Sequence, residues 1–309
     1  MGPRQWGLLA MLSVLWGASF MAIEVAITAF PPLTVVTCRV LFASLGLLLF
    51  MRATGQQLPG AGRDDKLKVW GALVVMGLLN NIMPFSLIVW GQTQIASSLA
   101  SILNATMPIF TVFVAHFFIS DERLTPQRFM GVFIGFLGVV SIIGLGGIAK
   151  GGALLGQFAI LGAALSYAFA VVAGRRFVGL GLKPVQMAFG QVTMAAIMLI
   201  PVTLMVDKPY LLPMPGAHVW AALLSLSLLS TALAYLLYFR LIAEAGATSA
   251  SLVTLTVPVV ATTFGILFLG EMLAASHVLG LGLIALGLMV LDGRLIARLK
   301  GKALRGTLD

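Results

Sequence analysis

Charged residues are scarce in this chain, and their scarcity excludes a water-soluble protein. Asp, Glu, Lys and Arg make up only 9% of the 309 residues, whereas hydrophobic residues make up 60%. Soluble globular domains carry roughly 25% charged residues, which cover a surface that faces water. A surface that faces lipid has no such need, so the composition predicts an integral membrane protein.

Cysteine and clustered histidine are also lacking, which excludes several kinds of site. The single cysteine, Cys38, cannot form an intrachain disulfide or a cysteine-based metal cluster. The histidines His116, His218 and His277 fall on different segments, and no Asp or Glu lies in the middle of an apolar run. An enzyme needs such groups to converge, so we expect no enzymatic activity, no metal and no cofactor.

What the sequence has instead is ten apolar runs, each long enough to cross a bilayer as a helix of about 20 residues. The third to the ninth contain no charged residue. The runs are Trp6–Ile27, Leu33–Phe50, Val69–Trp90, Ala96–Ile119, Phe129–Leu145, Ala153–Gly174, Pro184–Val206, Val219–Phe239, Thr248–Leu269 and His277–Leu295. Their continuous apolar character predicts helices, because barrel strands are shorter and alternate in polarity.

The basic residues predict how these helices are oriented. If the N-terminus is inside, sixteen Lys and Arg residues lie in inner segments, and only Lys150 and Lys208 lie in outer ones. Inner loops of membrane proteins are enriched in Lys and Arg, so we expect both termini in the cytoplasm and the protein in the inner (plasma) membrane. Since the basic residues stand singly or in small groups between apolar runs, the net charge of +9 indicates topology rather than a nucleic-acid partner.

The chain consists of two similar halves. Ala100–Pro108 matches Ala250–Pro258 at a spacing of 150, and Gly131 and Gly138 are answered by Gly280 and Gly287 at a spacing of 149. Five glycines fall between residues 144 and 152. We predict a first five-helix repeat over 1–146, a glycine-rich linker over 147–152, a second repeat over 153–296 and a basic tail over 297–309. Because five is odd, the second repeat is inverted, as in many secondary transporters whose substrate site lies between the repeats.

These motifs resemble those of a known family. The Ala-Ser…Thr-x-Pro helix, a following Glu (Glu122 and Glu271), Arg39-Val40-Leu41-Phe42-Ala43 and Leu15-Trp16-Gly17-Ala18-Ser19-Phe20 resemble the EamA units of the drug/metabolite transporter superfamily. The resemblance covers essentially the whole chain. It implies ten helices around a central cavity, cytoplasmic termini and export of small metabolites. Within the family, the resemblance suggests a YddG-like amino-acid exporter.

Arg39 is the one basic residue that lies in a span rather than in an inner or outer segment, about two turns from the outer end of its span. A charged residue in a span faces a cavity or a partner, because insertion costs roughly 2.5–3.5 kcal/mol. Two interpretations stay open: Arg39 binds an anionic group of the substrate, such as a carboxylate, or it forms a structural pair with Glu24 or Glu271.

Other polar, aromatic and methionine side chains at mid-depth are candidates for lining the site. Amides and hydroxyls in hydrocarbon need partners, which a neighbouring helix or a wet cavity supplies. Each is therefore either a substrate contact or an interhelical contact. The candidates besides Arg39 are Trp16, Ser19, Met21, Asn80, Asn81, Met83, Asn104, Tyr167, Tyr235 and Tyr238. Pro108 and Pro258 occupy matching positions midway along two spans, where proline bends a helix; we interpret them as gating kinks or as static bends.

Together these features predict a secondary transporter that exports small metabolites, most of all amino acids, by alternating access. A nucleotide-sugar or phosphate-ester exchanger is the alternative carrier, although it would need several cavity cations. A channel is the alternative outside carriers. We expect the partners to be a small-molecule substrate and the lipid bilayer, with the chain a monomer or weak homodimer. Proton coupling and facilitated export both stay open.

Overall fold

The computed structural model describes residues 2–119, 125–148, 151–246 and 250–292, and it is an all-helical membrane protein. Helices account for every regular element in these ranges. Eight are long and apolar enough to cross a membrane, and two shorter apolar ones complete the predicted set of ten. The predicted linker 147–152 is described only in part, and Glu122 and the tail 297–309 lie outside the described residues.

Five spans are single helices of at least 22 residues, and the third and eighth spans each change helix type in the middle. The single helices are α1 (Pro3–Ala26), α2 (Pro32–Ala53), α7 (Pro126–Ile148), α8 (Gly151–Phe177) and α9 (Pro184–Val206). The third span is α3 (Lys66–Gly77), the π-helix η1 (Leu78–Ile82) and α4 (Met83–Gln92). The eighth is α10 (Ala217–Leu224), the π-helix η4 (Ser225–Leu233) and α11 (Ala234–Ala245).

The fourth span is divided into two helices, α5 (Ser97–Asn104) and α6 (Met107–Phe118). Pro108 lies in the first turn of α6, where proline is tolerated because the N–H it lacks has no partner within the helix. The Thr106 hydroxyl donates to the Leu103 carbonyl at 2.6 Å and satisfies one acceptor at the break. Pro108 therefore marks an interruption rather than a bend.

The ninth and tenth spans are α13 (Val253–Leu269) and α14 (Ala275–Asp292). Pro258 is buried inside the continuous helix α13. The two prolines are therefore not equivalent in local structure, although their sequence positions match. The expectation of two symmetric kinks is wrong in this respect, and a gating role for either proline stays a prediction.

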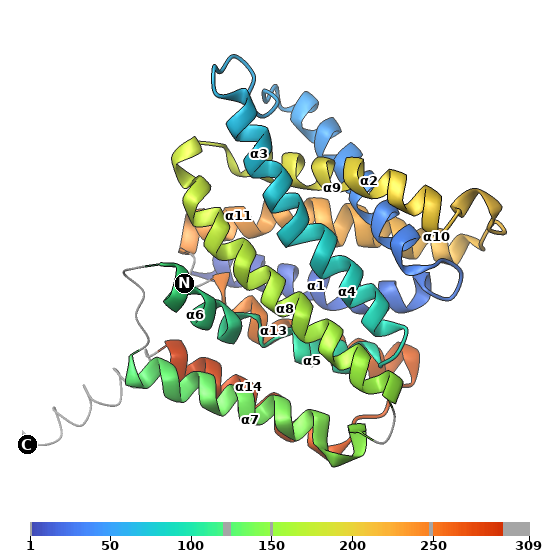
Figure 1. Ribbon diagram of the computed structural model, residues 1–309, viewed down its shortest axis with the longest axis vertical. Coiled ribbons are helices and arrows are strands. Elements are labelled where there is room, and N and C mark those ends of the chain that lie inside the picture. The colour runs from blue at the N-terminus through green and yellow to red at the C-terminus, as the bar shows by residue number, and fades with distance from the viewer. Residues whose placement is uncertain (1, 120–124, 149–150, 247–249, 293–309) are drawn as a thin grey trace, which may run out of the picture.

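The two halves interlock through their first helices. Helix α1 packs mainly against α13, with further contacts to α10 and α11 of the second half. In the second half, α8 packs against α4, α5 and α6 of the first half. Equivalent helices also pair directly, α2 with α9 and α7 with α14, and the last pair runs along one edge of the bundle in Figure 1.

Glycines set the closest of these contacts. A Cβ on Gly138 would lie 2.8 Å from the Gly280 carbonyl oxygen, and a Cβ on Gly287 would lie 2.6 Å from that of Gly131. These are the four glycines spaced by 149 in the sequence. Gly131 packs against Gly287, the equivalent of Gly138, and Gly138 packs against Gly280, the equivalent of Gly131. Such reciprocal contacts are those of two helices related by a twofold axis, and small residues permit this approach in membranes.

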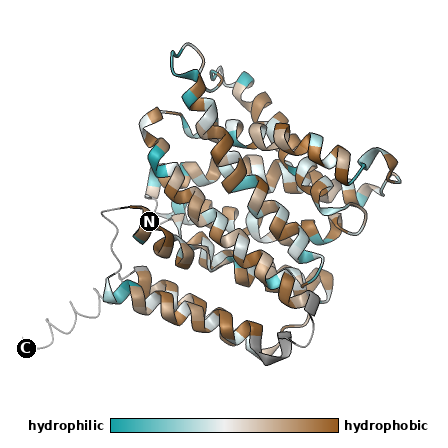
Figure 2. Cartoon of the chain, viewed as in Figure 1, coloured by the Kyte–Doolittle hydropathy of each residue, from teal (hydrophilic) through white to brown (hydrophobic). Residues whose placement is uncertain are grey.

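The outer surface of the bundle is apolar. Leu49, Phe117 and Leu267 are exposed by 66%, 65% and 69%. Figure 2 shows hydrophobic residues over most of the helices, with hydrophilic ones conspicuous in the connection between α2 and α3. This surface is suited to lipid rather than water, so the protein is a multi-pass membrane protein.

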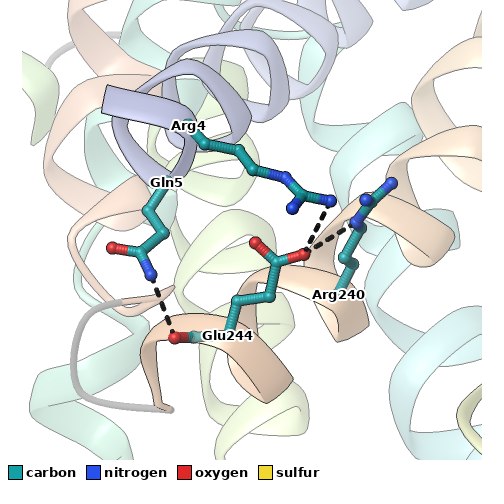
Figure 3. A network of polar contacts seen from close by, with 4 residues as sticks. All are labelled: Arg4, Gln5, Arg240 and Glu244. Carbon is teal, nitrogen blue, oxygen red and sulfur yellow. Dashed lines mark hydrogen bonds and ion pairs between the residues drawn. The ribbon is translucent and has the colours of Figure 1, made fainter. Parts of the chain in front are cut away.

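Polar contacts join helices α1 and α11 at the end of the bundle where the chain begins. We call this end the N-terminal end. Glu244, near the end of α11, accepts from Arg240 at 2.9 Å and lies 3.3 Å from Arg4 of α1. The Gln5 amide donates to the Glu244 carbonyl at 3.1 Å (Figure 3). The start of α1 is thus fastened to the second half at this end.

We predict that Gly138→Ala and Gly287→Ala destabilise the protein, because the new methyl group would meet backbone atoms of the facing helix. Overpacking costs about 1–3 kcal/mol, which a thermal melt in detergent would register as a lower Tm. Gly282→Ala in α14 is the matched control, since no atom lies within 4 Å of its added Cβ. Either test variant melting at or above this control would contradict the packing.

Candidate functional site

Arg39 lies at the centre of a buried polar cluster at mid-depth. It is 6% exposed on α2, and its Nε donates to the Thr231 hydroxyl of η4 at 2.9 Å. The guanidinium carbon lies 3.6 Å from the centre of the Phe85 ring of α4, a cation–π contact. Tyr167 of α8 and Tyr235 of α11 lie within electrostatic range of the charge. Helices from both halves therefore enclose this single cation.

The interpretation in which Arg39 forms a structural pair with Glu24 or Glu271 is wrong. Glu271 accepts instead from the backbone N–H groups of Ser97 and Ser98 at 2.8 and 3.0 Å, where the N-terminus of α5 attracts a carboxylate. Glu24 accepts from the Gln92 amide at 3.3 Å. Among the described residues, no carboxylate pairs with Arg39.

Tyr235 links the cluster to the two asparagines of η1. Its hydroxyl donates to Asn81 Oδ1 at 3.0 Å and accepts from Asn80 Nδ2 at 3.4 Å. Asn80 also donates to Gln191 Oε1 of α9 at 3.0 Å. Asn81 is fully buried, and its Nδ2 has no hydrogen-bond partner. A buried donor without an acceptor is costly, so the Asn81 Nδ2 group is a hydrogen-bond donor that is still available beside the cluster.

The two π-helices place these side chains. Adding 150 to residues 78–82 of η1 gives 228–232, which lies within η4. Asn81 thereby corresponds to Thr231, the hydroxyl that contacts Arg39. A π turn interrupts the regular i→i+4 backbone hydrogen bonds of an α-helix, and such turns often occur at functional sites. Each half contributes one such turn to the same polar centre.

Trp16 and Tyr238 form an aromatic pair between α1 and α11. Their ring centres are 5.3 Å apart, and Tyr238 also contacts Phe239 at 5.8 Å. Ser19 uses its hydroxyl locally, donating to the Trp16 carbonyl at 2.6 Å. Through Phe239, which contacts Tyr235 at 6.4 Å, this pair is continuous with the polar cluster.

The remaining candidates are not brought into hydrogen-bonding contact with Arg39. Met21 is half-buried, and Met83, at the start of α4, is 43% exposed. Asn104 ends α5 at the interruption, and its buried Oδ1 has no hydrogen-bond partner. Asn104 thus presents a free acceptor at the break in the fourth span, while the roles of these three side chains stay predictions.

Sequence reasoning missed three members of the cluster: Phe85, Gln191 and Thr231. Gln191 is a polar residue in an otherwise apolar run, which is the signal that singled out Asn80. The spacing of 150 would have found Thr231 from Asn81. Phe85 gives no sequence signal, because a phenylalanine in a span usually faces lipid or other side chains.

The model of the EamA-like transporter family matches this chain twice, over residues 4–144 and 154–291. The chain belongs to the EamA-like transporter family.

Similar EamA-family proteins include named but uncharacterized transporters. The chain is 28% identical over 281 residues to the uncharacterized transporter YoaV of Bacillus subtilis (strain 168), covering 90% of this chain and 93% of that one. It is 27% identical over 288 residues to the uncharacterized inner membrane transporter YedA of Escherichia coli (strain K12), covering 92% and 89%. A crystal structure with 18% identity superposes with a TM-score of 0.68 over 96% of this chain and 99% of the other. That likeness supports the fold.

We predict that Tyr235→Phe lowers the stability of this EamA-family protein. Removing the hydroxyl leaves Asn81 Oδ1 buried without its donor, which costs about 1–3 kcal/mol. Tyr238→Phe is the matched control, since the contacts of Tyr238 are made by its ring. Thermal unfolding in detergent should separate the two variants. Equal Tm values would show that the Tyr235–Asn81 bond contributes nothing.

Proposed function

We propose that this protein is a secondary transporter that exports amino acids across the plasma membrane by alternating access. The observation that carries the proposal is the buried charge of Arg39, which no carboxylate in the described part of the chain meets. Removing an isolated charge from water is costly unless an opposite charge meets it. A substrate carboxylate would supply that charge and would form charge-assisted hydrogen bonds with the free guanidinium nitrogens.

The groups around Arg39 suit the rest of a zwitterion. The amides of Asn80, Asn81 and Gln191 offer acceptors for an ammonium group, and the Trp16–Tyr238 pair offers an aromatic surface for a side chain. The basic residues of the N-terminal end favour a cytoplasmic location for that end. Export then corresponds to movement from the N-terminal end toward the end at which α1 finishes.

Phosphate esters and nucleotide sugars are less well suited to this centre. Their phosphate groups carry more negative charge than a carboxylate and are usually met by several Lys or Arg. Arg39 is the single Lys or Arg in the middle of the described spans. One cation balances one carboxylate, which favours a zwitterionic solute.

We predict that Arg39→Gln lowers amino-acid exchange by at least about tenfold, since a hydrogen bond to a charged group contributes roughly 1.5–3 kcal/mol. The measurement is counterflow into proteoliposomes of a mixture of 14C-labelled L-amino acids. Amino-acid methyl esters, which lack the carboxylate, should compete poorly with wild-type exchange.

Arg52→Gln is the matched control, because Arg52 lies on the same helix but is exposed at its end. It should exchange amino acids as the wild type does. The proposal fails if Arg39→Gln folds and exchanges normally, or if sugar phosphates compete better than amino acids. Size-exclusion profiles of both variants would separate lost binding from lost folding.

A further inference from the structure

A second polar cluster lies at the end of the bundle opposite the N-terminal end. It consists of two hydrogen-bonded pairs: Glu24 of α1 with Gln92 at the end of α4, and Ser97 at the start of α5 with Glu271 just after α13. None of them contacts Arg39. We call these four residues the exit cluster.

Glu271 is the fixed member of the exit cluster. Both of its carboxylate oxygens accept backbone N–H groups, from Ser97 and Ser98. Gly265 makes room for this carboxylate, because a Cβ there would lie 2.4 Å from Glu271 Oε2. The N-terminal amides of α5 therefore hold a negative charge in place.

Glu24 is the member that is not satisfied. It is partly buried and experiences the negative charge of Glu271. Its one side-chain donor is the Gln92 amide, whose Nε2 lies 3.3 Å from Glu24 Oε2 and also donates to the Phe20 carbonyl at 2.9 Å. An ionised Glu24 is thus repelled by Glu271 and held by one long hydrogen bond.

Two buried oxygens of the exit cluster lack partners. Gln92 is 3% exposed, and its Oε1 has no hydrogen-bond partner; Ser97 is fully buried, and its Oγ has none. Gln92 Oε1 belongs to the same amide that contacts Glu24, and it requires a donor. An ionised carboxylate has no hydrogen to give, whereas a protonated carboxyl has one. A proton on Glu24 would both supply the missing donor and remove the repulsion.

We propose that Glu24 binds a proton, and that this proton holds closed the end of the bundle at which α1 finishes. Loss of the proton restores the repulsion between Glu24 and Glu271 and separates the end of α1 from α5 and the segment after α13. The proposal deepens the alternating access proposed above and rests on it. Gln92 and Glu271 act as positioning residues for the protonated group.

Other titratable groups at this end must be separated from Glu24. Helix α4 contributes Gln92, and α5 contributes Ser97 and Ser98, none of which titrates in the relevant range. Helices α10 and α14 begin at the same end, with His218 and His277 near their starts. Arg240 and Glu244 of α11 lie at the N-terminal end. Asp207, which follows α9 at this end, accepts from the backbone N–H and the hydroxyl of Thr34 instead. The two histidines are therefore the remaining rival sources of a pH effect.

The test measures the opening directly, without any substrate. Spin labels are placed at Thr28 and Met272, which are exposed at the ends of α1 and α13, in a Cys38→Ser background in lipid nanodiscs. Pulsed electron–electron double resonance (DEER) spectroscopy then gives the distance between the two labels at pH 5.5 and pH 8. We expect a single short distance at pH 5.5 and a second, longer one at pH 8.

Glu24→Gln should abolish the longer distance at pH 8, because glutamine mimics the protonated carboxyl. Asp64→Asn, in the exposed α2–α3 connection, should keep it, as should His218→Gln and His277→Gln. The proposal is overturned if pH does not change the distances, if Glu24→Gln responds as the parent does, or if a histidine variant removes the response. Since no solute is involved, these outcomes do not depend on whether amino acids are transported.

Discussion

The arrangement of the polar centre depends on keeping one guanidinium ion away from water. Arg39 is buried at mid-depth without an acidic partner among the described residues, so each neighbour must compensate part of its charge. The Phe85 ring supplies the negative face of its π system, and Thr231 supplies a hydroxyl oxygen. Among the described residues, no carboxylate pairs with the guanidinium group. We infer that recognition of a carboxylate follows from this incomplete compensation.

The fold brings the two halves together at that point. Arg39, Asn81 and Phe85 come from the first half, and Thr231 and Tyr235 come from the second. They meet because the first helix of each half packs within the other and because equivalent helices pair across the bundle. Glycine contacts between α7 and α14 fasten the edge, while the centre is built from polar contacts and rings.

Much of the fold was predictable from the sequence, because lipid imposes a simple rule on composition. A run of about 20 apolar residues must be a helix, and each of the ten runs is helical over most of its described residues. The glycine spacing identified equivalent positions in the two halves, and the α7–α14 contact shows that these glycines pack against one another. Arg39 was identifiable because a charge inside a span is conspicuous.

The partners of Arg39 and the local helix geometry were less predictable. Phe85 lies beside Arg39 only because of how α2 and α4 are packed, and no local pattern encodes that contact. The π-helices depend on one extra residue per turn, which composition does not report. The prediction that Arg39 pairs with Glu24 or Glu271 was wrong because it considered only the signs of the charges. The N-terminal backbone amides of α5, which bind Glu271, were not foreseen.

The distance between Arg39 and a bound solute tests the central claim most directly. The protein would be labelled with 15N in its arginine guanidinium groups and saturated with amino acids carrying 13C in the carboxyl group. Rotational-echo double-resonance NMR in lipid would then measure the nitrogen–carbon separation. The account predicts a separation of about 4 Å, as in a charge-assisted hydrogen bond, which disappears in Arg39→Gln. Bound amino acids whose carboxyl carbon shows no dipolar coupling to an arginine would contradict it.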